Sequence, residues 1–390
     1  MASRRRFLAC LAAVLVATAC RAPSGRPLGT PTAVAPGVEL YRTADDSLVN
    51  HAGPIAVSLL KIDPSIVMLR SALSNREVMH ADTVESIARS VDAIAAVNGG
   101  YFNRDNGEPI GLLKVGGELV SDTGSPRGAV VINEQPDGRT TLAFDRLAAK
   151  MTLTYTANGQ TRVVGIDGVD TTRARGKLML YTPQYHADTD TAPTGTEWVL
   201  DGVPLRVVDV RMNFGHTRIP PRGAVLSFGG TDLPPELAPL VEDVAVTFAT
   251  RWTSLYNTDP AVLDRASDIV AGAGLLRQSG AVVQDWGSEG LSTDEFTHAR
   301  HPRTIIGIDK GGFIWLVVVD GRQPSYSIGM TFEDLQRLCD RLGLTDALNL
   351  DGGGSTTMVV KGQLMNRVSD SIGPRAVSDA LVVLPRPRIP

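Results

Sequence analysis

Apolar residues near the C-terminal end of the chain alternate with polar ones in a way that predicts a strand, a helix and a second strand. Residues 313–319 (FIWLVVV) form a continuous apolar run that is typical of a buried strand. From residue 332 to 342 apolar side chains recur at helical spacing, and residues 347–350 form the next strand. Two strands joined through a helix are expected to be parallel, so Asp320 and Asp351 would leave the same edge of the sheet.

The predicted helix carries end signals of its own. Thr331 and Asp334 have the spacing of a capping box, and Gly343 is a natural stop. Cys339 lies on the apolar face of this helix, which predicts a buried thiol.

A similar strand–helix–strand pattern occurs earlier. Residues 82–85 open a helix, residues 93–97 form a strand, and Asn98 with the pair Gly99 and Gly100 follows. This segment, AVNGGYF, is similar to NLDGGGS at 349–355. We therefore expect Asn98 and Asp351 to lie on one rim.

The stretch from Asn349 to Val360 (NLDGGGSTTMVV) has the most distinctive pattern in the chain. Asp351 ends an apolar run, and three glycines and three hydroxyl residues follow before a second apolar run. Glycines admit close approach, and their amide N–H groups can line a concave anion site. The alternative is an ordinary tight turn with solvated polar residues.

Much of the remaining chain reads as strands separated by turns, most densely over residues 150–250. We predict an α+β fold with a mixed β-sheet core, flanking helices and a strand-rich inserted region. The domain-like body is expected over 38–385, with 150–250 as the insert or subdomain and 386–390 as a disordered tail.

The first residues resemble an export signal. Arg4, Arg5 and Arg6 give a twin-arginine pattern, and a short apolar stretch ends before Cys20. We predict a signal peptide over 1–19, lipidation of Cys20, and a flexible tether over 20–37, which would place the protein on the outer face of the cytoplasmic membrane. The alternative is a soluble secreted protein cut near Ala19.

Charge and cysteine usage exclude some classes of function. The formal net charge of −4 becomes −7 when the three signal arginines are removed, which argues against a nucleic-acid partner. Of three cysteines, Cys10 lies in the signal and Cys20 is the predicted anchor, which leaves Cys339 alone. The mature chain is therefore expected to have neither an internal disulfide nor a cysteine-based metal site.

Basic residues before a strand suggest an anion clamp. His298, Arg300, His301 and Arg303 precede the apolar residues 305–308. Arg303 is the stronger candidate because a guanidinium can hold a phosphate through two parallel hydrogen bonds, whereas a lone histidine is more often structural. Arg375 is a second candidate clamp.

The chain resembles the phosphodiester glycosidase family. The resemblance rests on AVNGGYF at 96–102, HPRT at 301–304, VVVDGR at 317–322, GMTFEDL at 329–335, NLDGGGSTTMVV at 349–360, NRVSD at 366–370 and R-x-V-S-D-A-L at 375–381, in the family's order. Val368 departs from the family's usual proline, and Ser371 to Pro374 stand where a glutamate is frequent. The resemblance implies hydrolysis of the bond between a sugar's anomeric carbon and a phosphodiester oxygen.

This reaction fits a site with one carboxylate. Most glycosidases use a second carboxyl group to protonate a basic leaving group, but a phosphate monoester leaves as a weak base. We expect Asp351 to act as nucleophile or general base and Arg303 to bind the phosphate. Asp320 is either a second carboxylate or a structural cap, and Asn98 would contact sugar or phosphate. The other expected substrate-binding residues are Gly99, Tyr101, His301, Gly352, Gly353, Gly354, Ser355, Thr356 and Arg375.

Two other functions remain open, and no cofactor is required. The chain could be a non-catalytic envelope glycan-binding module, or a conventional glycoside hydrolase with two carboxylates. A divalent cation could bind between Asp320 and Asp351, but no ligand spacing demands one. The expected substrate is an N-acetylhexosamine 1-phosphodiester in an envelope or extracellular glycan.

Overall fold

The fold is mostly β-sheet, which corrects the predicted α+β class. The computed structural model describes residues 28–291 and 294–386. Within these two ranges, strands account for 44% of the residues and helices for 11%, with four short α-helices. The predicted signal peptide, twin arginines and Cys20 lie outside the described residues. Among those described, no helix is both long and apolar enough to span a membrane.

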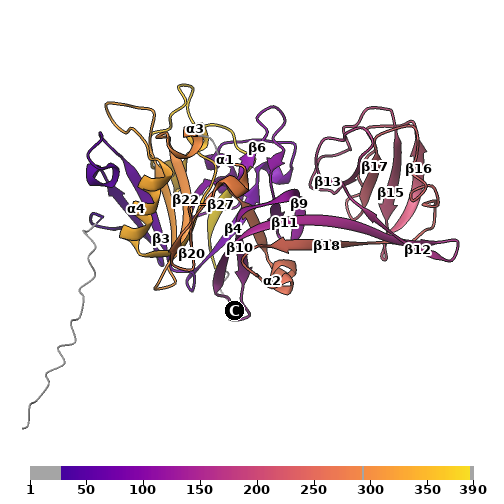
Figure 1. Ribbon diagram of the computed structural model, residues 1–390, viewed down its shortest axis with the longest axis horizontal. Helices are drawn as coiled ribbons and strands as arrows, with labels where there is room; N and C mark the ends of the chain where they lie inside the picture. Colours follow the sequence, from indigo (N-terminus) through magenta and orange to yellow (C-terminus); the bar gives the residue numbers. More distant parts are fainter. Residues whose placement is uncertain (1–27, 292–293, 387–390) are drawn as a thin grey trace, which may run out of the picture.

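Four layers make up the body of the molecule (Figure 1). Helix α4 (Phe332–Leu342) covers one sheet and helix α1 (Val84–Ser90) covers another, and the two sheets face each other across the largest buried cluster. Neighbouring residues of one strand divide between these layers: Leu316 lies in the central cluster and Val317 under α4. Alternation across a strand explains why both sheets read as nearly continuous apolar runs.

The sheet under α4 has eight strands. Its order is β1 (Thr32–Ala35), β2 (Val38–Thr43), β3 (Val57–Ile62), β23 (Ile314–Val319), β22 (Arg303–Asp309), β24 (Leu344–Asn349), β20 (Leu275–Gln278) and β21 (Ala281–Val282). Strand β1 lies inside the segment predicted as a tether, so ordered structure begins earlier than expected.

The sheet under α1 has five strands. Its order is β26 (Gln363–Leu364), β25 (Met358–Val360), β5 (Ala95–Asn98), β27 (Asp379–Pro385) and β4 (Val67–Leu73). At the end of β27, Arg386 forms an ion pair with Glu134, so this first residue of the predicted tail is held against the body.

A seven-stranded sheet connects the body to the inserted region. It contains β12 (Gln160–Gly165), β11 (Thr140–Ala157), β10 (Thr123–Glu134), β19 (Asp268–Ala271), β8 (Leu113–Val115) and β9 (Glu118–Ser121), with β18 (Val246–Ser254) paired to β11. Figure 1 shows β11 and β18 extending together toward a separate small sheet. That sheet contains β13 (Gly168–Val169), β14 (Leu178–Tyr181), β17 (Ala224–Phe228), β15 (Thr196–Asp201) and β16 (Arg206–Met212).

The remaining elements are short. They are the strand pair β6 (Tyr101–Phe102) and β7 (Pro109–Ile110), and helices α2 (Pro260–Arg265) and α3 (Asp294–Thr297).

The predicted helix ends are confirmed. The Thr331 side chain accepts the Asp334 amide and the Asp334 side chain accepts the Thr331 amide, which completes the capping box. Gly343 ends α4 in a left-handed conformation with φ 71°. Cys339 is fully buried in the cluster under this helix, as predicted.

The strands on either side of each predicted helix are parallel, as expected, but a third strand lies between them. Strands β23 and β24 both pair antiparallel with β22, so they are parallel to each other but separated by it. Strands β4 and β5 are separated by β27 in the same manner. The intervening strands come from distant parts of the chain, which a local apolar pattern cannot reveal. Each of them begins at the edge where its two neighbours end.

Candidate active site

This strand arrangement brings the predicted residues to one edge of the two sheets. Arg303 is the first residue of β22, and Asp351 follows the end of β24 by two residues. Asn98 is the last residue of β5 and pairs with Ala380 of β27. The expectation that Asp351 and Asn98 share one rim is met, since the Asn98 side chain reaches the Asp351 backbone.

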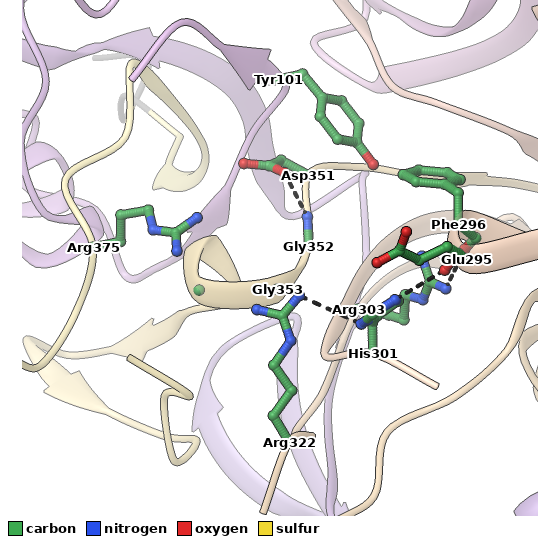
Figure 2. Close-up of a pocket in the computed structure, with 11 residues that line it drawn as sticks. Tyr101, Glu295, Phe296, His301, Arg303, Arg322, Asp351, Gly352, Gly353 and Arg375 are labelled. Carbon is green, nitrogen blue, oxygen red and sulfur yellow. Dashed lines mark hydrogen bonds between the residues drawn. The ribbon is translucent and has the colours of Figure 1, made fainter. Parts of the chain in front are cut away.

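A pocket of about 380 Å³ opens at this edge (Figure 2). It is lined by Tyr101, Glu295, Phe296, His301, Arg303, Arg322, Asp351, Gly352, Gly353, Gly354 and Arg375. Eight of these eleven residues are among the site residues predicted from the sequence.

Asp351 is a carboxylate held in an unusually weakly hydrated position. Burial raises its pKa from 3.8 to about 6. The Gly352 N–H donates to Asp351 Oδ1 at 2.8 Å and partly offsets that rise, as does the positive charge of Arg375. The Ser355 hydroxyl also lowers the pKa, although it makes no direct hydrogen bond of good geometry. At neutral pH the group is therefore an ionised carboxylate that is more basic than an exposed aspartate.

Asn98 and Gly99 hold the backbone of Asp351 from both sides. Asn98 Nδ2 donates to the Asp351 carbonyl at 2.8 Å, and the Asp351 N–H donates to the Gly99 carbonyl at 3.2 Å. Asn98 Oδ1 accepts from Thr304 Oγ1 and from the Thr357 amide, and the side chain is fully buried. Asn98 and Gly99 therefore support Asp351, and neither lines the pocket, where substrate contact was expected.

A second buried carboxyl group lies behind this turn. Asp379 Oδ1 accepts the Gly100 N–H at 3.1 Å, and the Ser378 hydroxyl donates to the same atom at 3.2 Å. Burial raises the pKa of Asp379 to about 6, and the charge of Asp351 contributes to the rise. Asp379 does not line the pocket, so we assign it to the support of the Gly99–Gly100 turn.

Arg303 is a buried guanidinium without a carboxylate partner among the described residues. Its Nε donates to the Met330 carbonyl at 3.0 Å, and its Nη2 donates to the Phe296 and Ala299 carbonyls at 2.7 and 3.2 Å. The group lies over the rings of Phe296 and Phe332, at 5.5 and 4.9 Å from their centres. Burial lowers its pKa to about 10, so it stays charged at neutral pH.

His301 and Arg322 form a second basic contact. His301 Nε2 lies 3.0 Å from the Glu295 carbonyl, which can only accept, so this nitrogen carries the proton. Arg322 Nη2 donates to His301 Nδ1 at 3.4 Å, and burial together with the two arginines lowers the histidine pKa. His301 is thus a neutral residue that orients Arg322.

The glycine turn supplies fewer free donors than the sequence suggested. It forms the short 3₁₀ helix η4 (Gly353–Ser355). The Gly352 N–H donates to Asp351, that of Gly353 to the Pro302 carbonyl at 2.9 Å, and that of Ser355 to the Gly352 carbonyl at 3.1 Å. Only Gly354 keeps an N–H without a partner within the described chain, so the expected amide nest is reduced to one donor. The side chains of Ser355 and Thr356 are buried and do not line the pocket.

The absence of side chains in this turn is required by two arginines. A Cβ on Gly353 would lie 3.1 Å from both terminal nitrogens of Arg322. A Cβ on Gly354 would lie 2.1 Å from Arg375 Nη2 and 2.3 Å from Asp370 Oδ1. Both guanidinium groups therefore lie directly against the turn.

Tyr101 and Phe296 form an aromatic wall of the pocket. Their ring centres are 6.3 Å apart. The Tyr101 hydroxyl donates to the Leu350 carbonyl at 3.1 Å and accepts from Asn349 Nδ2 at 3.3 Å, so it braces the strand that carries Asp351.

Asp320 has a structural position. Its Oδ1 accepts from Asn366 Nδ2 at 2.9 Å and its Oδ2 from the Arg367 amide at 3.0 Å. It is buried and does not line the pocket. This arrangement ties Asp320 to the segment at Asn366 and Arg367, whereas the cap considered from the sequence was on the Gly321 turn. The arrangement also means that Asp320 and Asp351 do not face a common cavity where a cation could bridge them.

Sequence reasoning missed three pocket residues: Glu295, Phe296 and Arg322. Glu295 and Phe296 belong to the four-residue helix α3, which carries no pattern of its own. The sequence does contain a signal for Arg322, because this residue ends the family motif VVVDGR directly after Gly321. Its backbone has φ 60°, an uncommon left-handed conformation that aims the side chain at the glycine turn.

Comparisons with known proteins agree with this site. Residues 207–384 match the phosphodiester glycosidase family, a range that includes every pocket residue except Tyr101. The resemblance predicted from the motifs is therefore confirmed.

The matches to two curated proteins are partial. The uncharacterized SPbeta prophage-derived protein YomE of Bacillus subtilis is 40% identical over 86 residues, which cover 22% of this chain and 13% of that protein. The mouse N-acetylglucosamine-1-phosphodiester alpha-N-acetylglucosaminidase is 30% identical over 95 residues, which cover 24% and 18%. The chain thus matches less than a fifth of the length of either relative.

A solved structure extends the likeness to the whole body. A Burkholderia pseudomallei protein described as a presumed exported protein has a TM-score of 0.73 at 26% identity. The match covers 85% of this chain and 74% of that one. The family match covers ten of the eleven pocket residues, and the structural match covers most of the β-sheet body.

Proposed function

We propose that the chain is a hydrolase that cleaves the bond between a sugar's anomeric carbon and a phosphodiester oxygen. The proposal rests on one observation: the same pocket is lined by an ionised Asp351 and by the buried guanidinium of Arg303, which has no carboxylate partner among the described residues. An unpaired buried cation is costly, and an anionic ligand would compensate it.

The residues divide the chemistry between them. Asp351 acts at the anomeric carbon, either as nucleophile or as general base for a water molecule. The bond between the anomeric carbon and the phosphate oxygen breaks, and the phosphate monoester leaves with the electron pair. Arg303 and Arg322 stabilise the charge on the departing phosphate. The proposed substrate is an N-acetylhexosamine 1-phosphodiester in an envelope or extracellular glycan.

One observation favours a second candidate, a conventional two-carboxylate glycosidase. Glu295 lines the same pocket and would supply the second carboxyl group that such an enzyme needs to protonate a basic leaving group. Glu295 therefore takes the place of Asp320 as the residue that distinguishes a phosphodiester glycosidase from a two-carboxylate glycosidase.

Leaving-group dependence tests the proposal. The full chain should be assayed with a glycosyl phosphodiester, an activated aryl glycoside and an alkyl glycoside of the same sugar. Without a general acid, the phosphodiester and aryl substrates are cleaved and the alkyl glycoside is nearly inert, because an absent acid typically costs about 10²–10⁴-fold.

Glu295→Gln is the discriminating variant, and Asp320→Asn is its control. If Glu295→Gln reduces alkyl-glycoside cleavage alone, the two-carboxylate reading is right. Asp320→Asn should leave the leaving-group dependence unchanged. If the wild type cleaves none of these substrates and only binds glycan, the chain is a binding module.

We further propose that the protein is exported and anchored through a lipid on Cys20. The support is the twin-arginine pattern with its apolar stretch, and the exported description of the Burkholderia relative. Cys20→Ser should move the protein from the membrane fraction to the soluble fraction. Unchanged partition would remove the anchor.

A further inference from the structure

The arginines of the pocket fall into two electrostatic classes. Arg303 and Arg322 form no ion pair among the described residues. Arg375 forms a bidentate pair with Asp370: its Nε donates to Oδ2 at 2.8 Å and its Nη2 to Oδ1 at 3.1 Å. A phosphate would be attracted by the first two arginines, whereas the third is already neutralised. Arg375 therefore does not fit the role of second phosphate clamp that the sequence suggested.

Arg375 lines the pocket, and its partner Asp370 lies beside it against the lining residue Gly354, although Asp370 is not itself a lining residue. Arg375 Nη2 and Asp370 Oδ1 both occupy the space that a Cβ on Gly354 would need. The two side chains are 21% and 26% exposed, so the pair is open on one side. Arg375 Nη1 has no hydrogen-bond partner within the described chain. Each Asp370 oxygen accepts a single hydrogen bond and keeps further acceptor capacity.

The Asp370–Arg375 pair and Arg322 contact different glycines of the turn. Arg322 lies against Gly353, and Arg375 lies against Gly354. Figure 2 shows Arg375 and Arg303 reaching the pocket from opposite sides, with Asp351 between them. Arg375 is also the arginine whose charge acts most strongly on Asp351.

We propose that Asp370 and Arg375 form the sugar subsite, where they bind neighbouring hydroxyl groups of the glycone. A carboxylate beside a guanidinium offers an acceptor next to a donor, and two adjacent hydroxyls can satisfy both at once. A neutral pair does so without attracting the phosphate. The proposal rests on the proposed function, since it orients the glycosyl phosphodiester: the sugar lies over Gly354 and the phosphoryl group lies toward Arg303 and Arg322.

Two separate probes test this division on the full chain. Inorganic phosphate reports the Arg303 side, and a panel of free hexoses and N-acetylhexosamines that differ at single hydroxyls reports the subsite. Dissociation constants are measured by ligand-observed NMR or calorimetry. Asp370→Asn should weaken binding of the preferred sugar about tenfold, the usual effect of losing a charged hydrogen bond, and flatten the preference among epimers. Phosphate binding should stay within about twofold of wild type. Arg303→Lys should show the reverse pattern.

The outcomes separate this inference from the proposed function. Unchanged sugar binding in Asp370→Asn, or equal weakening of sugar and phosphate, overturns the subsite. Phosphate binding by the wild type without binding of any sugar in the panel also overturns it. Sugar binding that depends on Asp370 in a protein without hydrolytic activity keeps the subsite and rejects the phosphodiester glycosidase reaction. Asp370→Asn retains the size of the side chain, and an unchanged thermal midpoint identifies a correctly folded variant.

Discussion

Asn98 Nδ2 donates a hydrogen bond to the main-chain carbonyl of Asp351 at 2.8 Å, although 253 residues separate the two positions. The bond joins the end of one sheet to the turn that leaves the other. Because the same amide also accepts from Thr304 and Thr357, Asn98 ties three segments together at the base of the pocket.

Asn98→Ala should therefore damage both stability and turnover. It leaves one buried carbonyl and two buried donors unpaired, which should lower the free energy of unfolding by about 2–4 kcal/mol. The value of kcat should fall more than KM rises, because Asp351 is displaced while the phosphate contacts remain. Thr304→Val is the matched comparison: it removes one partner of Asn98 and keeps the bond to Asp351. Equal loss of kcat in the two variants would contradict the positioning role.

Asp351→Asn should abolish turnover and stabilise the fold. The raised pKa means that the folded state holds the charged form at a cost. Above pH 6 the carboxylate is ionised in both states, so the variant should be more stable, by about 1–3 kcal/mol. Below pH 3.8 the group is neutral in both states and the difference should vanish. Thermal midpoints of both proteins at pH 7.5 and pH 4 measure this, and a variant less stable than wild type at pH 7.5 would refute the assignment.

The same pKa predicts the pH dependence of the reaction. If Asp351 must be ionised, kcat/KM should fall as pH drops through about 6 rather than through the ordinary aspartate value of 3.8. A phosphodiester substrate stays singly charged over this range, so the acidic limb reports the enzyme. A profile that stays flat down to pH 4.5 would exclude Asp351 as the ionised group.

The buried environment of Arg303 predicts that lysine cannot replace it. Lysine cannot reach three carbonyls and a phosphate at once, nor can it present a planar guanidinium to the rings of Phe296 and Phe332. Arg303→Lys should reduce kcat/KM on a glycosyl phosphodiester by about 10²-fold or more. Arg367→Lys is the control, since Arg367 lies over the Tyr326 ring at 5.3 Å and does not line the pocket. Near-normal activity of Arg303→Lys would remove Arg303 from the site.

Short-range patterns predicted the parts of this site that lie within one motif. The capping box of α4, the turn after Asp351 and the arginine before β22 are all set by neighbouring residues. The roles of Asn98 and Asp320 could not be read in this way. An asparagine or aspartate after a strand looks the same whether it faces a ligand or a buried backbone, and only the pairing of distant strands decides between them.

The fold class was wrong for a related reason. The two helices next to the site exist, but the strands beside them pair with strands from remote segments. Those pairings place β22 between β23 and β24, and they place β27 between β4 and β5. Most of the chain adds further antiparallel strands. That arrangement brings three further residues to the pocket, namely Glu295, Phe296 and Arg322. Their spacing along the chain does not predict that they line it.

Gly354→Ala tests the contact that defines the proposed sugar side of the pocket. The added Cβ would lie 2.1 Å from Arg375 Nη2 and 2.3 Å from Asp370 Oδ1, so the ion pair must move away from the turn. Because Arg375 is flexible, we expect the fold to survive and the cost to fall on substrate binding, with KM raised at least about tenfold.

Gly287→Ala is the matched control for this variant. Gly287 also lies in a short 3₁₀ helix, η3 (Gly287–Glu289), but a Cβ there meets no atom within 4 Å. The control should be neutral or should stabilise the fold by up to about 1 kcal/mol, because alanine restricts the unfolded chain. Gly354→Ala could also match the control in KM and in thermal midpoint. In that case the Asp370–Arg375 pair does not need this glycine, and the contact between the pair and the glycine turn is refuted.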